Sequence, residues 1–275
     1  KMLADMTVYA QDDALLIDTE PGMSQTLSQL LDRYLLIDDV TMADVTDHLS
    51  LIAVHGPRST DLLAALIGPF SPLNVPQHLT RDVHGIPLLI TRTNRTGEAG
   101  YDLYVPPEHA GTLWSALLDR GRQFGARPVG LDALDVLRVE AGIPQYGVDM
   151  NDNIIPVEAR ITERAVSFTK GCYIGQETVA MITYRGRPNK LLVGLRVEGE
   201  AMPARGSKIL NEGQEVGWVT SGVRSLSLDG VIALGYVKRN YTESGNHLTV
   251  VVGESTVGAE VVELPFYRPQ RSEAS

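Results

Sequence analysis

The chain has 275 residues, of which 43% are hydrophobic and 21% charged, enough for one large globular domain or two to three smaller ones. Its formal net charge of −10 repels a polyanion at long range and argues against nucleic acid as a partner. The single cysteine, Cys172, excludes an internal disulfide and by itself assembles no metal site, so we expect no metal and a reducing compartment, the cytoplasm or a mitochondrial matrix.

No apolar run approaches the ~20 residues that cross a bilayer, so we expect no membrane partner. The six histidines are scattered and lack the spacing of metal ligands on one helix. The chain begins at Lys1, without a methionine and inside a strand-like pattern, which suggests a fragment or a processed form.

The first half of the chain alternates β-prone hairpins with amphipathic helices, which indicates an α+β fold with mixed or antiparallel sheets rather than a doubly wound parallel sheet. The predicted elements are a hairpin of 2–9 and 14–18, a helix over 23–36, a strand over 49–55, a helix over 59–67, a hairpin of 86–92 and 101–105, and helices over 108–124 and 130–141.

From Lys190 onward the pattern changes to short strands separated by Gly, Asn and Ser, which is typical of a small β-barrel or sandwich. These strands are predicted over 191–197, 215–220, 231–236, 247–252 and 256–262. We therefore predict an α+β core over 1–185 with two subdomains, a C-terminal β-barrel over 186–266 and a disordered tail over 267–275.

The densest run of reactive side chains is Lys170-Gly171-Cys172-Tyr173-Ile174-Gly175-Gln176-Glu177. A helix that begins at Gln176 would, together with the Lys170 ammonium, favour a thiolate at Cys172. The alternative is a small apolar cysteine packed inertly in the core, and composition alone favours that alternative.

Three charged residues and one basic stretch have both a functional and a structural interpretation. Asp5 lies on a strand whose faces both look half buried, where a carboxylate is paired or functional unless the strand is an exposed edge. Glu98 lies in a glycine-flanked turn, where a solvated charge is the usual interpretation. Arg138 follows Asp135 by three residues, as in an ion pair on a solvated helix face. The stretch 184–190 is either a solvated loop or a receptor for an anionic tail.

Four segments of the chain resemble segments of one protein family, and they occur in the same order. KMLADMTVY resembles the strand of aminomethyltransferases that carries the catalytic aspartate, with Asp5 at that place. TRTNRTGEAGYDLYVP resembles their Arg-Thr-Gly-Tyr-Thr-Gly-Glu signature and places Glu98 at the pterin-binding glutamate. GLDALDVLRVEAGIPQYGVDM is similar to their helix and tyrosine-glycine turn, with Arg138 and Tyr146 at matched positions. GWVTSGVRSLSLDGVIALGYV resembles part of their barrel.

The segment KGCYIGQE resembles the signature of the YgfZ-type proteins of iron–sulfur cluster maintenance, which true T-proteins lack. Cys172 then falls on the functional cysteine of that subfamily. The resemblance implies tetrahydrofolate or a one-carbon derivative as cofactor, and we assign Lys170, Tyr173 and Arg185 to its binding as well.

Two positions depart from the T-protein pattern, because Asp18 stands in place of an asparagine and Arg95 in place of a tyrosine. Both departures fit a relative that keeps folate binding and loses aminomethyl transfer. We therefore expect a folate-binding protein of iron–sulfur enzyme assembly or repair, with those enzymes as clients. Two alternatives remain: a tetrahydrofolate-dependent aminomethyltransferase, in which Asp5 assists proton transfer, and a non-catalytic folate-liganded scaffold.

Overall fold

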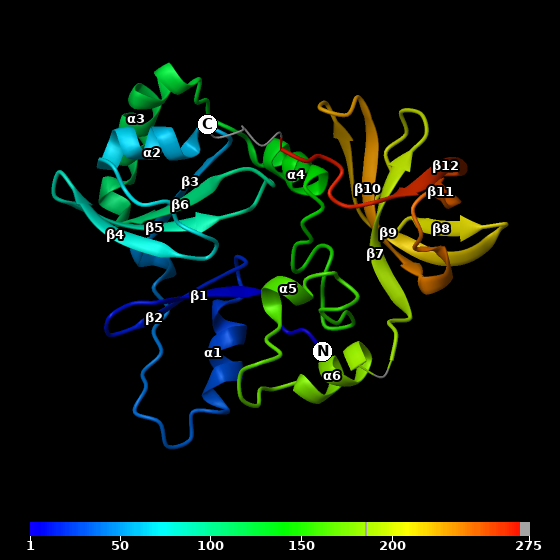
Figure 1. The fold of residues 1–275 in the computed structure, drawn as a ribbon, viewed down its shortest axis with the longest axis horizontal. Coiled ribbons are helices and arrows are strands. Elements are labelled where there is room, and N and C mark those ends of the chain that lie inside the picture. The colour runs from blue at the N-terminus through cyan, green and yellow to red at the C-terminus, as the bar shows by residue number, and fades with distance from the viewer. Residues whose placement is uncertain (185, 270–275) are drawn as a thin grey trace. The chain divides into compact units, whose positions relative to one another are not determined.

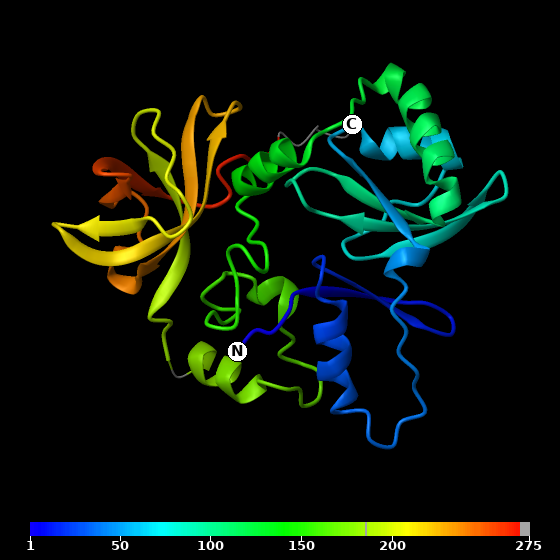
Figure 2. The same cartoon turned by 180° about the vertical axis from the view of Figure 1, so that it is seen from behind.

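A computed structural model describes residues 1–184 and 186–269 (Figures 1 and 2). They form two compact units, of which unit 1 comprises 1–3 together with the chain from Leu131 onward, and unit 2 comprises Ala4–Gly130. Within the described part of the chain, no helix combines the length and the apolar character that a bilayer span requires.

Unit 2 contains a four-stranded antiparallel sheet in the order β3-β6-β5-β4, with helices on one face (Figure 1). Its elements are β3 (Ser50–His55), α2 (Ser59–Ile67), β4 (His78–Val83), β5 (Ile86–Thr93), β6 (Gly100–Val105) and α3 (Pro107–Gly121). In β6, Tyr101, Leu103 and Val105 join the hydrophobic core that α2 and α3 complete. The period-two alternation of a strand then places Asp102 and Tyr104 on the opposite, more polar face of the sheet.

A two-stranded hairpin precedes this sheet in unit 2. It consists of β1 (Met6–Ala10) and β2 (Leu15–Thr19), and α1 (Ser24–Asp32) follows it. The buried ring of Tyr9 packs edge-on against the rings of His78 and Tyr104, with centroids 5.7 and 6.3 Å away. The first strand is shorter than predicted, so Asp5 lies just before it and is half-buried.

Gly100 begins β6 against the imidazole of His55, where a Cβ atom would lie 2.2 Å from Nδ1. We expect Gly100→Ala to lower the free energy of unfolding of unit 2 by about 1–3 kcal/mol, because the largely buried ring cannot move aside without repacking. Gly111→Ala is the matched control: its Cβ would meet nothing within 4 Å in the middle of α3, so it should stabilise by up to about 1 kcal/mol. Urea unfolding followed by Trp114 fluorescence in a Trp218→Phe background measures both changes, and equal stabilities would contradict the expected clash.

After residues 1–3, unit 1 resumes at helix α4, and it contains a closed six-stranded barrel in the order β10-β7-β12-β11-β8-β9. Its elements are α4 (Leu131–Glu140), α5 (Thr162–Ala165), α6 (Gln176–Tyr184), β7 (Lys190–Val197), β8 (Lys208–Asn211), β9 (Gln214–Ser225), β10 (Gly230–Lys238), β11 (His247–Val252) and β12 (Ser255–Val262). Single turns of 3₁₀ helix cover Thr46–His48 and Arg122–Phe124 in unit 2 and Arg239–Tyr241 in unit 1.

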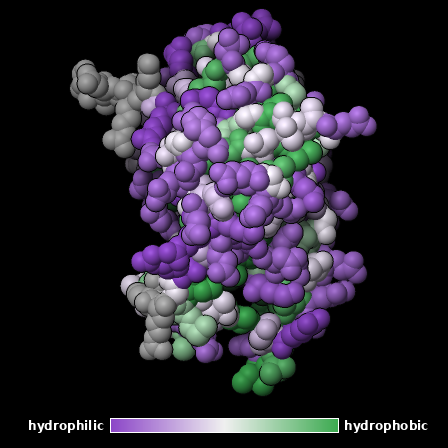
Figure 3. Space-filling model, turned by 90° about the vertical axis from the view of Figure 1, so that its right-hand side faces the viewer, coloured by the Kyte–Doolittle hydropathy of each residue, from purple (hydrophilic) through white to green (hydrophobic). Residues whose placement is uncertain are grey.

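Strand β10 is buried on both faces, which explains its nearly continuous apolar sequence. Val231 and Ala233 belong to a core to which all six barrel strands contribute. Ile232, Leu234 and Tyr236 belong to a second core, shared with α4 and the segment that follows it. On the molecular face drawn in Figure 3, hydrophilic side chains predominate and hydrophobic ones are interspersed among them.

The predicted α+β class and the C-terminal β-barrel are confirmed, and the barrel is closed rather than a sandwich. Strands β4 and β8 and the short helix α5 were not predicted. The predicted domain division at 185/186 falls inside unit 1 and stays a prediction. Of the predicted disordered tail, 270–275 lies outside the described residues, whereas the Tyr267 amide donates a hydrogen bond to the Glu140 carbonyl at 2.9 Å.

Candidate functional site

Unit 2 holds an ion-pair cluster centred on Arg95, on the polar side of the sheet. The Arg95 guanidinium donates from Nε and Nη2 to Asp102 Oδ2, at 3.0 and 2.7 Å, and from Nη2 to Asp18 Oδ2 at 3.2 Å. The Asp102 side chain is fully buried, whereas 24% of Asp18 and 40% of Arg95 are exposed. The two residues that depart from the T-protein pattern, Asp18 and Arg95, are therefore paired with each other.

The surroundings set the protonation states in this cluster. Burial raises the pKa of Asp18, and the positive charge of Arg95 opposes that rise. Burial disfavours the charge of Arg95, yet the neighbouring carboxylates, with Asp102 the largest contributor, together outweigh it and hold the Arg95 pKa above its usual value. Burial, reinforced by Asp18, raises the pKa of Tyr104, and burial likewise raises that of Tyr9. Both phenols therefore stay protonated at neutral pH and can donate hydrogen bonds.

Unused hydrogen-bonding capacity lies beside this cluster. Asp102 Oδ1 and both ring nitrogens of His55 are buried and have no hydrogen-bond partner among the described residues. The His55 Nε2 atom lies 3.9 Å from Asp102 Oδ1, and burial lowers the His55 pKa, although Asp102 opposes the shift. Thr96 Oγ1, in the turn that carries Glu98, is also buried and without a partner there. Such atoms mark places that water or a polar ligand satisfies.

The two carboxylates assigned to the cofactor site, Asp5 and Glu98, both belong to unit 2 and are both half-buried. The backbone carbonyl of Asp5 accepts a hydrogen bond from Thr19 Oγ1 at 3.0 Å, which ties this segment to the end of β2. Glu98 follows Gly97, whose φ of +79° suits glycine. Glu98 is thus less exposed than a solvated turn charge, and its contact with a pterin stays a prediction.

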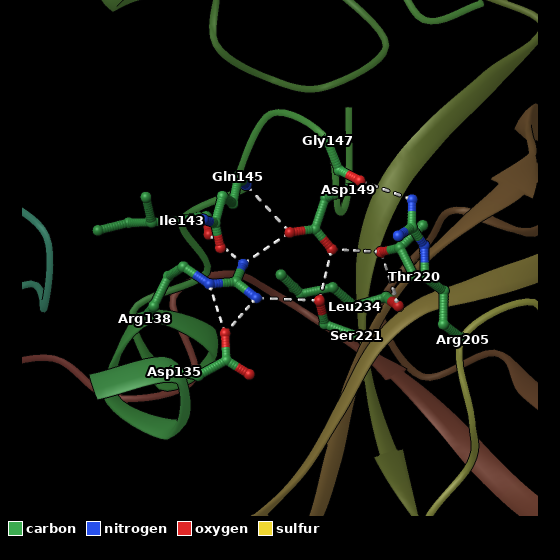
Figure 4. Close-up of polar contacts among 10 residues, drawn as sticks. All are labelled: Asp135, Arg138, Ile143, Gln145, Gly147, Asp149, Arg205, Thr220, Ser221 and Leu234. Atoms are coloured by element: carbon green, nitrogen blue, oxygen red, sulfur yellow. Dashed lines mark hydrogen bonds and ion pairs between the residues drawn. The ribbon is translucent and has the colours of Figure 1, made fainter. Parts of the chain in front are cut away.

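Arg138 anchors a buried polar network in unit 1 (Figure 4). Its Nε and Nη2 atoms donate to Asp135 Oδ1 at 2.9 and 2.7 Å, and Nη1 donates to Asp149 Oδ2 at 2.6 Å. Further bonds run from Nη1 to the Ile143 carbonyl and from Nη2 to Ser221 Oγ. The expected ion pair with Asp135 is present, but Arg138 is buried rather than on a solvated face. Every guanidinium nitrogen donates a hydrogen bond within unit 1, and the cofactor role of Arg138 stays a prediction.

Asp149 was not singled out from the sequence, yet its fully buried carboxylate joins α4 to the barrel. Oδ1 accepts from Thr220 Oγ1 at 2.6 Å and Ser221 Oγ at 2.7 Å, and Oδ2 accepts from the Gln145 amide at 3.0 Å. The sequence signal that could have identified Asp149 as buried is a carboxylate flanked by apolar residues on both sides. The same signal marks Asp102 in β6.

Tyr146, another assigned residue, is half-buried in unit 1. Its hydroxyl donates to the Met2 carbonyl at 3.3 Å, and its ring packs against the second core. Burial, reinforced by Asp152, raises the Tyr146 pKa. The phenol is therefore protonated at neutral pH, and its assignment to cofactor binding stays a prediction.

The predicted thiol segment is a loop in unit 1 that leads into α6, and α6 begins at Gln176 as predicted. Cys172 is exposed, so its alternative placement in the core is wrong. The Lys170 ammonium lies 5.0 Å from the ring centroid of Tyr173, and the Tyr173 amide donates to Gln176 Oε1 at 3.3 Å. Arg185 lies outside the described residues.

Two family models match the chain. The model described as the GCVT N-terminal domain matches residues 1–170, and the model described as the glycine cleavage T-protein C-terminal barrel domain matches residues 190–268. The second match contains all six barrel strands. The family resemblance recognised in the sequence is thereby confirmed at the level of the superfamily.

Individual relatives agree with these models. An aminomethyltransferase of Saccharopolyspora erythraea is 35% identical over 97% of this chain and 73% of its own length. An aminomethyltransferase of Streptomyces coelicolor is 36% identical over 98% of this chain and 74% of its own length. The crystal structure of glycine cleavage system aminomethyltransferase T from Bartonella henselae has a TM-score of 0.85 and 26% identity, covering 97% of this chain and 72% of that one. These relatives lend no support to the narrower YgfZ-type assignment or to iron–sulfur clients. The chain belongs to the glycine cleavage T-protein family, the family of the aminomethyltransferases.

Proposed function

We propose that this chain binds tetrahydrofolate, or a one-carbon derivative of it, and transfers an aminomethyl unit. The observation that carries the proposal is the polar side of the sheet in unit 2. There the buried ring nitrogens of His55 and Oδ1 of Asp102 have no hydrogen-bond partner within the described part of the chain, and the relatives of the chain are aminomethyltransferases. A polar ring with several hydrogen-bonding edges is the kind of ligand that such atoms accommodate.

A pterin ring presents adjacent N–H donors, which match a carboxylate through two parallel hydrogen bonds, and Glu98 would supply that carboxylate. When bound, tetrahydrofolate supplies the nitrogens that accept the one-carbon unit. Asp5 would orient the cofactor. Its carboxylate would also hold the proton that moves at a nitrogen of tetrahydrofolate as the C–N bond of the aminomethyl donor breaks. Asp5 and Glu98 both belong to unit 2.

Calorimetric titration of the purified chain with tetrahydrofolate and with its methylene form tests the binding. Turnover with an aminomethyl-lipoyl carrier protein then tests the transfer. Saturable binding and release of ammonia support the whole proposal, whereas binding without turnover removes the transfer step. The absence of binding to either form would reject the cofactor assignment itself.

A second candidate function is support of iron–sulfur enzymes, in the manner of the YgfZ-type proteins. The specific observation in its favour is the KGCYIGQE segment, in which Cys172 is exposed ahead of α6. In this function Cys172 is the reactive group and tetrahydrofolate remains the ligand. The iron–sulfur client enzymes are then the partners.

Cys172 separates the two functions. We expect iodoacetamide to label the native chain once, at Cys172, because this thiol is exposed and is the sole cysteine. Aminomethyl transfer predicts that Cys172→Ser keeps both tetrahydrofolate affinity and turnover. The iron–sulfur function predicts that the variant keeps the affinity but no longer restores iron–sulfur enzyme activity in a deletion strain. Full complementation by the variant would leave Cys172 without a role in the support of iron–sulfur enzymes.

A further inference from the structure

A cavity of about 270 Å³ lies within unit 1. The stretch 184–190, considered above as a receptor for an anionic tail, contributes Lys190 to its lining. The segment 148–154, the beginning of β7 and the strands β9 and β10 line it. Its chemically distinctive side chains are Lys190, Arg205, Trp218 and Tyr236. Trp218 and Tyr236 pack against each other with ring centroids 5.4 Å apart, so together they form a flat aromatic wall.

The side chain of Tyr236 is fully buried, and among the described residues its hydroxyl oxygen has no hydrogen-bond partner. Burial, reinforced by the charges of Asp149 and Glu158, raises the pKa of Tyr236, so the group is a neutral donor at physiological pH. Because a buried donor without an acceptor costs free energy, an acceptor that reached this hydroxyl from the cavity would relieve that cost.

The cavity is locally cationic in a chain with a net charge of −10. Arg205 donates from Nη2 to the Gly147 carbonyl at 2.8 Å (Figure 4), and it lines the cavity together with Asp149 and Thr220. Asp149 also lines the cavity, but its carboxylate is neutralised by Arg138 at 2.6 Å. The cation of Arg205 therefore keeps its attraction for an incoming anion.

Lys190 supplies the second cation. Its ammonium lies 5.3 Å from the ring centroid of Trp218 and 3.4 Å from the Asn153 carbonyl. Glu158 Oε2 is 3.8 Å away, at the long end of an ion pair. The ammonium thus has capacity for a further oxygen ligand, and the indole face beside it excludes water from one side.

We propose that this cavity is a binding subsite for the carboxylate of a small molecule, with Arg205 and Lys190 as its cations, Tyr236 as a neutral hydrogen-bond donor and Trp218 as the aromatic wall. The carboxylate belongs either to the glutamate tail of a folate or to a free amino acid. This inference does not depend on aminomethyl transfer, since it concerns residues of unit 1 alone.

The indole N–H resonance of Trp218 in a ¹H–¹⁵N spectrum of the full chain reports directly on the cavity, and a Trp114→Phe variant identifies it. We expect saturable shifts of this resonance on titration with L-glutamate or with p-aminobenzoyl-L-glutamate. Arg205→Met should weaken the response about tenfold or more, because it removes a charge-assisted hydrogen bond. Arg196→Met is the matched control, since it removes an equal charge from a residue that does not line this cavity and should leave the affinity unchanged.

Tyr236→Phe separates binding from packing. If the hydroxyl serves a ligand, its removal should weaken glutamate binding about threefold or more while leaving the melting temperature of the free chain equal or higher. A lower melting temperature with unchanged glutamate binding would instead make the hydroxyl structural and overturn its assignment.

Tetrahydrofolate and tetrahydropteroate, which lacks the glutamate, distinguish the two sources of the carboxylate. A Trp218 shift with tetrahydrofolate but not with tetrahydropteroate identifies the folate tail, and a shift with L-glutamate alone identifies a free amino acid. Equal shifts with both pterin compounds, or no shift with any of the four ligands, would overturn the proposal. Overall tetrahydrofolate affinity, measured by calorimetry, reports separately on the proposed function.

Discussion

Arg138→Met is expected to lower the free energy of unfolding of unit 1 by about 3–5 kcal/mol, because it leaves a buried carboxylate without its counter-charge. The Asp149 side chain has no solvent exposure, and Arg138 Nη1 approaches it to 2.6 Å. The substitution also removes the bond to Ser221 on β9, so the link between α4 and the barrel weakens. Urea unfolding followed by Trp218 fluorescence in a Trp114→Phe background measures the loss.

The control for this prediction is Arg196→Met, at an exposed pair with Glu260 in the same unit, which should cost at most about 1 kcal/mol. The double variant Arg138→Met/Asp149→Leu should recover part of the lost stability, because it removes both buried charges. A loss below about 1 kcal/mol for Arg138→Met would show that the network contributes little to stability.

Glu98→Ala is expected to weaken tetrahydrofolate binding by about 2–4 kcal/mol, roughly one and a half to three decades in affinity, because two charge-assisted hydrogen bonds to the pterin are lost. The fold should stay intact, since Glu98 lies in a turn and is only half-buried. Calorimetric titration measures the affinity, and far-ultraviolet circular dichroism checks the fold.

Asp119→Ala is the matched control, because it removes an equal charge from an exposed position on α3 of the same unit. Its tetrahydrofolate affinity should equal that of the unmodified chain. Glu98→Gln refines the test: an amide keeps one acceptor but no charge, so its affinity should fall between the other two. Equal affinities in all variants would remove Glu98 from the cofactor site.

The amino-acid sequence by itself determined most of the secondary structure and the fold class. The helical spacing of leucines, the alternation in 101–105 and the apolar run 231–236 are local properties, and the structure contains the corresponding helices and strands. The strands that the sequence did not predict have weak patterns of alternating hydrophobicity. β4 carries Thr80, Arg81 and Asp82 at exposed positions of an edge strand, and β8 has four residues. The family was also readable, because its motifs are contiguous runs of the chain.

Only the tertiary structure decided which charged residues lie together. Asp18 and Arg95 are 77 positions apart, and Arg138 meets Ser221 across 83 positions. Pairing over such distances depends on how the strands are ordered and in which register they align, whereas hydrophobic periodicity reports only on a few neighbouring residues. The same reason explains why a lysine, an arginine and a tyrosine from separate strands and loops were not recognisable as one cavity before the barrel brought them together.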